Sequence, residues 1–217
     1  MCDRETEIAM DDFLRTEAPR TKPGSTYCRK CRMRRPPRTH HCSTCDVCVV
    51  RMDHHCPWIN SCIGIRTHKI FYLLSFYSFL LSLWIAATTG YTLFVYAVDG
   101  RFKLSSALHI QTVFLFLVSA PFLVLIALFL RYHTGLIAKN RTTLEDIIHR
   151  EEKRKYTDIN VIRRVEGQVP LRQKPSSPFD RGFCSNAKEV LGVCFLLWVV
   201  PFPIRKKEMK QYLVTAE

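Results

Sequence analysis

Residues 28–62 of this chain read CRKCRMRRPPRTHHCSTCDVCVVRMDHHCPWINSC, and they hold seven of its ten cysteines and four of its eight histidines. Two Cys-x2-Cys pairs open the stretch, Cys28 with Cys31 and Cys42 with Cys45, and three single cysteines follow. Thiolate and imidazole side chains at such spacing are typical of tetrahedral zinc sites. The stretch is rich in arginine and poor in apolar runs, so we expect bound metal to replace a hydrophobic core.

The ligand count predicts two zinc ions. Six cysteines and two histidines make eight candidate ligands, which are enough for two tetrahedral sites. The eight are Cys28, Cys31, Cys42, Cys45, Cys48, Cys62, His41 and His55.

Cys56 is left over by this count, and it lies in the run Asp53-His54-His55-Cys56. A histidine base can take the proton of a thiol, and a carboxylate can fix the tautomer of that histidine. Asp53, His54 and Cys56 are therefore the parts of an activated thiolate nucleophile. Neighbouring side chains usually point apart, however, and the three could equally be spare zinc ligands. The spacing leaves both interpretations open.

The fold class follows from charge and hydropathy. The 217 residues carry 32 Lys and Arg against 19 Asp and Glu, a net charge of +13, which suits nucleic acid, an anionic membrane surface or an anionic ligand. Residues 70–98 and 104–130, however, are runs of 29 and 27 residues without any Asp, Glu, Lys or Arg. A bilayer needs about 20 apolar residues in a helix, and a chain this short cannot bury two such helices in a soluble core. We therefore predict a mainly α membrane protein, a transmembrane helical hairpin with a small zinc-held cysteine-rich cytosolic domain.

The distribution of positive charge predicts the orientation. Arg66 and Lys69 precede the first span and Arg131 and Lys139 follow the second, whereas the loop at 99–103 has only two basic residues. By the positive-inside rule both flanks face the cytosol, where thiols also stay reduced. The predicted organisation is a flexible cytosolic N-terminus at 1–27, the cysteine-rich domain at 28–69, spans at 70–98 and 104–130, a lumenal loop at 99–103, and a cytosolic C-terminal region at 131–217.

Three features are expected in the C-terminal region. Thr142 and Glu145 have the spacing of a capping box that starts a helix. Residues 150–178, with charge clusters and three prolines, are expected to be loosely ordered. The apolar run at 190–200 is too short to span a bilayer, and we expect it to dock on the protein or to lie at the membrane interface.

Several of these motifs together resemble one family. Cys28-x2-Cys31, then Arg38-Thr39-His40-His41-Cys42-x2-Cys45-x2-Cys48-x4-Asp53-His54-His55-Cys56-Pro57-Trp58-Ile59, and Cys62-Ile63-Gly64, are similar to the cysteine-rich domain of the DHHC family of protein S-acyltransferases (palmitoyltransferases). Thr142-Thr143-Leu144-Glu145 is similar to the family's Thr-Thr-x-Glu motif. The segment from Pro178 through Asn186 to Gly192 resembles its C-terminal motif, in which the asparagine is structural.

The resemblance implies a mechanism. Cys56 would accept a fatty acyl group from palmitoyl-CoA, with His54 as base and Asp53 orienting it, and would pass the group on to a cysteine of a protein substrate. Thr143 would reach back towards Asp53, and Trp58 would either line the acyl entry or anchor the chain at the interface. One structural zinc ion would be held by Cys28, Cys31, His41 and Cys48, and the other by Cys42, Cys45, His55 and Cys62.

The resemblance also implies a setting: a multi-pass protein of the endoplasmic reticulum or Golgi membrane whose partners are the bilayer, acyl-CoA and cytosolic-facing proteins with cysteines, and not nucleic acid. The family has four spans and this sequence predicts two, which raises the alternative of a catalytically impaired two-span form that acts as a zinc-bearing membrane adaptor. Ser61 and Thr67 stand where the family has asparagine, and weaker local hydrogen bonds are expected there.

Overall fold

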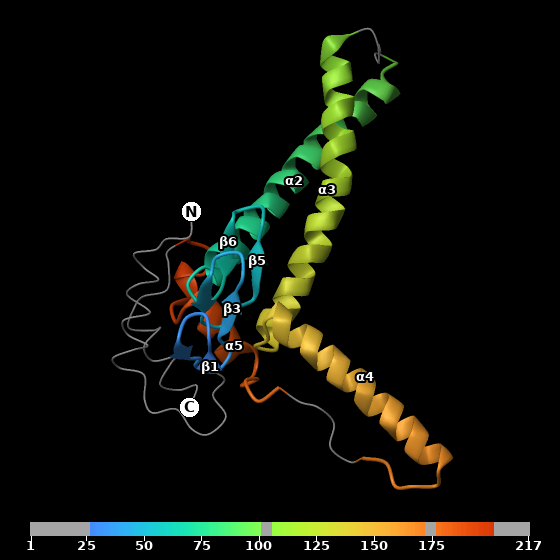
Figure 1. The fold of residues 1–217 in the computed structure, drawn as a ribbon. Helices are drawn as coiled ribbons and strands as arrows, with labels where there is room; N and C mark the ends of the chain where they lie inside the picture. The colour runs from blue at the N-terminus through green and yellow to red at the C-terminus, as the bar shows by residue number, and fades with distance from the viewer. Residues whose placement is uncertain (1–26, 101–105, 172–176, 202–217) are drawn as a thin grey trace. The chain divides into compact units, whose positions relative to one another are not determined.

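The structure is a computed structural model that describes residues 27–100, 106–171 and 177–201. The chain divides into two compact units, Met1–Lys69 with Leu136–Glu217, and Ile70–Gly135. Figure 1 allows the order of the elements to be followed along the chain. The N-terminal segment that was expected to be flexible, and most of the loop at 99–103, lie outside the described residues.

Three short antiparallel hairpins make up the cysteine-rich stretch (Figure 1). They pair β1 (Tyr27–Cys28) with β2 (Met33–Arg34), β3 (His40–Cys42) with β4 (Val47–Val49), and β5 (His54–Cys56) with β6 (Ser61–Ile63). Strands of two or three residues are too short to form a stable sheet by themselves. The hairpins therefore need cross-links from side chains, and the cysteines and histidines that they carry are suited to that task.

A small core lies between the second and third hairpins. Cys42, Met52 and Cys62 are buried together, and Val49 packs against them. Gly64 follows β6 at a close approach, because a Cβ at this position would lie 2.6 Å from Cγ1 of Val49. This tight packing explains why the chain has no side chain at residue 64.

Helix α4 (Thr143–Val165) begins with the predicted capping box. The Thr142 hydroxyl accepts a hydrogen bond from the Glu145 backbone N–H at 3.2 Å, and Thr142 N–H donates to Oε2 of Glu145 at 2.9 Å. The expectation of loose order from residue 150 was wrong, since the helix runs on to Val165. Charged pairs four residues apart, such as Glu151 with Lys155 at 2.7 Å, support that part of the helix.

The apolar run at 190–200 forms two short pieces and not one helix. Helix α5 (Phe183–Leu191) ends at Gly192, whose φ of 95° no other residue adopts easily, and the single 3-10 turn η1 (Phe195–Leu197) follows. Asn186 of α5 is fully buried, and its amide donates to the Ala138 carbonyl at 2.8 Å and to Oδ1 of Asp180 at 2.7 Å. These bonds fit the structural role that was predicted for Asn186.

The second unit consists of two long helices. Within the described residues, α2 (His68–Val98) and α3 (Ala107–Ala138) are the two helices that are long and apolar enough to cross a membrane. Only 28% and 6% of their most apolar windows are buried, so most of their apolar side chains lie outside the protein. The core helix of a soluble protein would be covered, whereas lipid solvates such a surface without cost.

Candidate functional site

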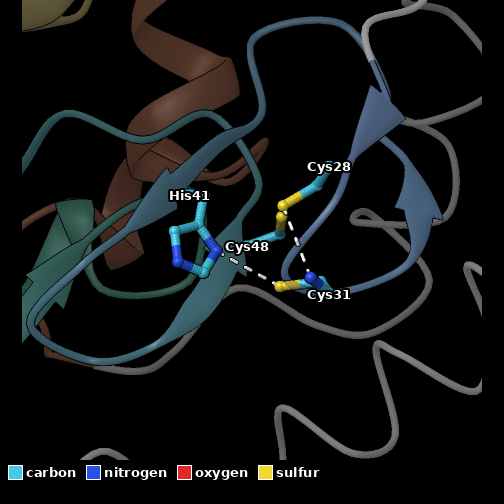
Figure 2. A group of neighbouring side chains, drawn as sticks. All are labelled: Cys28, Cys31, His41 and Cys48. Atoms are coloured by element: carbon cyan, nitrogen blue, oxygen red, sulfur yellow. Dashed lines mark hydrogen bonds between the residues drawn. The ribbon is translucent and has the colours of Figure 1, made fainter.

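Four predicted ligands from two hairpins come together in a first cluster. Cys28 and Cys31 belong to the first hairpin, and His41 and Cys48 are cross-strand neighbours in the second. One ligand atom from each lies within 4.8 Å of the others, and Figure 2 shows the four side chains converging. Sγ of Cys31 is 3.2 Å from Nδ1 of His41, and the Cys31 N–H donates to Sγ of Cys28 at 3.5 Å.

The second and third hairpins form a second cluster in the same way. Cys42 and Cys45 come from the second hairpin, and His55 and Cys62 are cross-strand neighbours in the third. Nδ1 of His55 lies 3.4 Å from Sγ of Cys45 and 3.6 Å from Sγ of Cys42. The structure thus brings the eight residues into the two groups of four that the family resemblance implied.

The donor chemistry of both clusters fits zinc. Each offers three thiols and one imidazole, the soft donor set that Zn²⁺ takes in closed structural sites. Burial, and then the neighbouring thiols, raise the pKa of Cys48 and of Cys62 well above the ordinary range. Crowded thiols of this kind ionise together only when a cation compensates their charge, so the clusters could hold zinc.

Strand geometry decides how the run from Asp53 to Cys56 is arranged. His54, His55 and Cys56 form strand β5, in which successive side chains point to opposite faces. His55 points towards the second cluster, and His54 and Cys56 therefore share the other face. The objection that neighbouring side chains point apart does not apply to this pair, because the two residues are not neighbours but lie two positions apart on a strand.

Asp53 is fully buried and is held by three hydrogen bonds. Nδ1 of His54 lies 2.7 Å from its Oδ2, the Thr143 hydroxyl donates to Oδ2 at 2.7 Å, and the Thr143 backbone N–H donates to Oδ1 at 2.8 Å. Burial by itself would raise the pKa of Asp53, but the His54 bond, the charge of His68 and the Thr143 bonds outweigh it and leave the pKa well below the usual range. The carboxylate therefore stays ionised and holds the Nδ1 proton of His54, which leaves Nε2 as the basic atom.

A buried charge network that the sequence reasoning missed surrounds this centre. Arg38 donates from Nε and Nη2 to both carboxylate oxygens of Glu145, each at 2.6 Å, and from Nη1 to Oδ1 of Asn140 at 2.9 Å. Arg51 is fully buried and donates to the same Oδ1 at 3.0 Å, and Glu189 of α5 lies 3.3 Å from both guanidinium groups. The available signal was the pair of arginines inside an otherwise metal-binding stretch.

Two further predictions concern residues near the site. Trp58 lies in the turn of the third hairpin, 94% exposed and outside both clusters, and its role stays a prediction. Thr67 does not weaken the local bonding as expected, because its hydroxyl donates to the Cys62 carbonyl at 2.9 Å and accepts from the Gly64 N–H at 3.0 Å. A hydroxyl can donate and accept at once, as an amide can.

Comparison with known proteins places this site in a family. Residues 21–150 match the family model described as DHHC palmitoyltransferase. The chain is 42% identical to Palmitoyltransferase ZDHHC20 of Homo sapiens over 119 residues, which are 55% of this chain and 32% of that protein. It is 36% identical to Palmitoyltransferase ZDHHC2 of Rattus norvegicus over 175 residues, 81% of this chain and 42% of the relative.

A more distant similarity extends to yeast. Palmitoyltransferase pfa3 of Schizosaccharomyces pombe is 31% identical over 155 residues, 71% of this chain and 41% of the relative. The matched region thus spans about a third to two fifths of the length of these curated relatives.

Proposed function

Because the chain belongs to the DHHC palmitoyltransferase family, we propose that it is a protein S-acyltransferase that transfers palmitate from palmitoyl-CoA to cysteine thiols of proteins. The observation that carries the proposal is the buried Asp53 carboxylate bonded to Nδ1 of His54, with His54 and Cys56 on one face of the same strand. A base and a nucleophile oriented by a third group is the general arrangement of covalent catalysis.

Acylation of the enzyme is the first step. Nε2 of His54 takes the proton of the Cys56 thiol, and the thiolate attacks the carbonyl carbon of the palmitoyl thioester. The carbon–sulfur bond to CoA breaks, the CoA thiolate leaves with the proton from His54, and palmitate stays on Cys56. Asp53 stabilises the imidazolium in between and is not itself protonated.

Transfer to the protein substrate reverses the roles. His54 takes the proton of the substrate thiol, that thiolate attacks the acyl carbon on Cys56, and the Cys56 sulfur leaves and regains a proton from His54. Zinc, when bound, supplies cross-links between the hairpins. The ligands proposed for it are Cys28, Cys31, His41 and Cys48 for one ion and Cys42, Cys45, His55 and Cys62 for the other.

A membrane location suits this chemistry. Cys56 precedes the first apolar helix by only a few turns of chain, and a palmitoyl chain gains about 0.8 kcal/mol for each CH2 it buries in lipid. The basic residues that flank both helices favour the cytosolic side for the zinc domain, the side where CoA and reduced thiols are found. The endoplasmic reticulum or Golgi membrane, and cytosolic-facing proteins with cysteines as substrates, complete the proposal.

The test is direct labelling. The full chain, purified in detergent with its zinc retained, is incubated with labelled palmitoyl-CoA. We expect a label that hydroxylamine removes, that Cys56→Ser abolishes and that Cys184→Ser retains, since Cys184 is an exposed cysteine of α5 away from the strand. Zinc-loaded protein that takes up no label would contradict the acyltransferase and favour the adaptor.

A further inference from the structure

The three hairpins repeat with a period of 14 residues. The first cysteine of each turn recurs at this interval, and it has the same place in each hairpin, opposite the first residue of the second strand. These positions are Cys28 opposite Met33, Cys42 opposite Val47, and Cys56 opposite Ser61. Each turn also ends in a residue with left-handed φ, namely Arg32 at 53°, Asp46 at 56° and Asn60 at 46°. The third hairpin is thus built as a cysteine knuckle like the other two.

Both metal clusters follow one rule. The first takes a cysteine pair from the turn of hairpin one and the cross-strand pair His41 and Cys48 of hairpin two. The second takes the turn of hairpin two and the cross-strand pair His55 and Cys62 of hairpin three. By this rule the turn of the third hairpin is a third metal-facing position, and neither cluster uses it.

Cys56 occupies the first ligand position of this third turn. It corresponds to Cys28 and Cys42, while Ile59 stands where those turns have Cys31 and Cys45. The Cys56 side chain is only 5% exposed, and within the described part of the chain no hydrogen bond to its thiol is found. A buried thiol in a metal-facing position is available for a soft cation as well as for an acyl group.

His54 supplies a second ligand on the same face of β5. Its Nδ1 lies 2.7 Å from a carboxylate oxygen of Asp53, the arrangement by which a carboxylate orients a metal-binding histidine and raises its basicity. Two differences from the first two turns weaken this position. The third turn has one cysteine, not two, and the described residues include no N–H···S bond like those that Cys31 and Cys45 donate at 3.5 and 3.4 Å.

We propose that Cys56 and His54 form a third, weaker site for a thiophilic divalent cation such as Zn²⁺. The cation binds the Cys56 thiolate and Nε2 of His54, and the thiol proton is released to solvent. Binding of the ion does not depend on the proposed acyltransferase function. The consequence that the ion blocks acylation of Cys56 rests on that function.

Zinc itself is the probe. The full chain in detergent, already holding two zinc ions, is titrated with buffered Zn²⁺, and the rate at which iodoacetamide alkylates each cysteine is followed by mass spectrometry. We expect Zn²⁺ to slow alkylation of Cys56 and to leave exposed Cys184 unaffected. Asp53→Asn should raise the zinc concentration needed about 10- to 100-fold, the usual loss when the partner of a metal-binding histidine is removed.

A gain-of-function variant keeps the test independent of damage to the site. Ile59→Cys restores the missing knuckle cysteine at a position that is 39% exposed. We expect this variant to protect Cys56 at lower zinc concentrations than wild type and to retain three zinc ions per chain after gel filtration, against two. Equal alkylation of Cys56 with and without Zn²⁺ in wild type, or two zinc ions in Ile59→Cys, would overturn the proposal. Neither measurement uses acyl-CoA, so a failure of palmitoyl labelling would leave this result unchanged.

Discussion

The hydroxyl of Thr143 is the contact through which helix α4 holds the reactive centre, and Thr143→Val removes it at nearly constant volume. The hydroxyl donates to Oδ2 of Asp53 at 2.7 Å, while the backbone N–H of residue 143 still donates to Oδ1 at 2.8 Å in the variant. Asp53 is fully buried, so water cannot replace the lost donor. The change therefore isolates one hydrogen bond to a buried charge.

The magnitude follows from the type of bond. A hydrogen bond to a charged group contributes about 1.5 to 3 kcal/mol. If all of this free energy served to hold Asp53 and His54 in the reactive position, the rate constant for acylation of Cys56 would fall about 10- to 150-fold, since about 1.4 kcal/mol corresponds to a factor of ten. We expect a fall of about tenfold or more at saturating palmitoyl-CoA, with an unchanged KM for the donor because Thr143 does not touch it in this mechanism.

Single-turnover labelling of Cys56 measures the rate, and thermal unfolding of the same samples measures stability. Thr143→Ser keeps the hydroxyl and is the matched control, for which we expect a rate within about threefold of wild type. Thr143→Val labelling as fast as Thr143→Ser would refute the reasoning, because the hydroxyl would then have no part in positioning Asp53. A raised KM with an unchanged maximal rate would refute it too.

Three other changes test the packing around the site. Cys48→Ser should lower the zinc content from two ions per chain to about one, measured by elemental analysis, and an unchanged content would contradict the first ligand group. Gly64→Ala should cost about 1 to 3 kcal/mol in unfolding experiments because its Cβ would lie 2.6 Å from a neighbouring side chain, whereas Gly135→Ala has open space and should be tolerated. Arg38→Met should destabilise the protein by about 3 to 5 kcal/mol because it leaves the Glu145 carboxylate without its bidentate partner, and Arg38→Lys should not restore stability; thermal unfolding at the wild-type temperature would count against this role.

The metal ligands were predictable because cysteine and histidine have few alternative uses at such density. The ligand count from the sequence needed only the spacing, and the structure gathers the same eight residues. The two apolar helices were equally accessible, since a run of 29 or 27 residues without charge has few stable places other than a bilayer. The capping box of α4 was found from Thr142 and Glu145 alone, because capping is a local interaction.

Other features depend on contacts that are distant in sequence. The sequence could not indicate that Arg38 would meet Glu145, 107 residues later, or that Glu189 of α5 would approach both buried arginines. The length of α4 was underestimated because its charged second half has no apolar periodicity, although pairs such as Glu151 with Lys155 stabilise the helix. The break of the apolar run at Gly192 depends on a left-handed φ that composition does not reveal.

By itself, then, the sequence determined the chemistry: eight soft ligands for two ions, a spare Cys56 beside His54 and Asp53, and two helices suited to lipid. Only the tertiary structure decided which of these groups act together. Strand β5 places His54 and Cys56 on one face because side chains alternate along a strand, and Thr143 from a distant helix fixes the carboxylate that orients the histidine. Residue identity is written in the chain, whereas orientation arises from hydrogen bonds between segments that meet only when the protein folds.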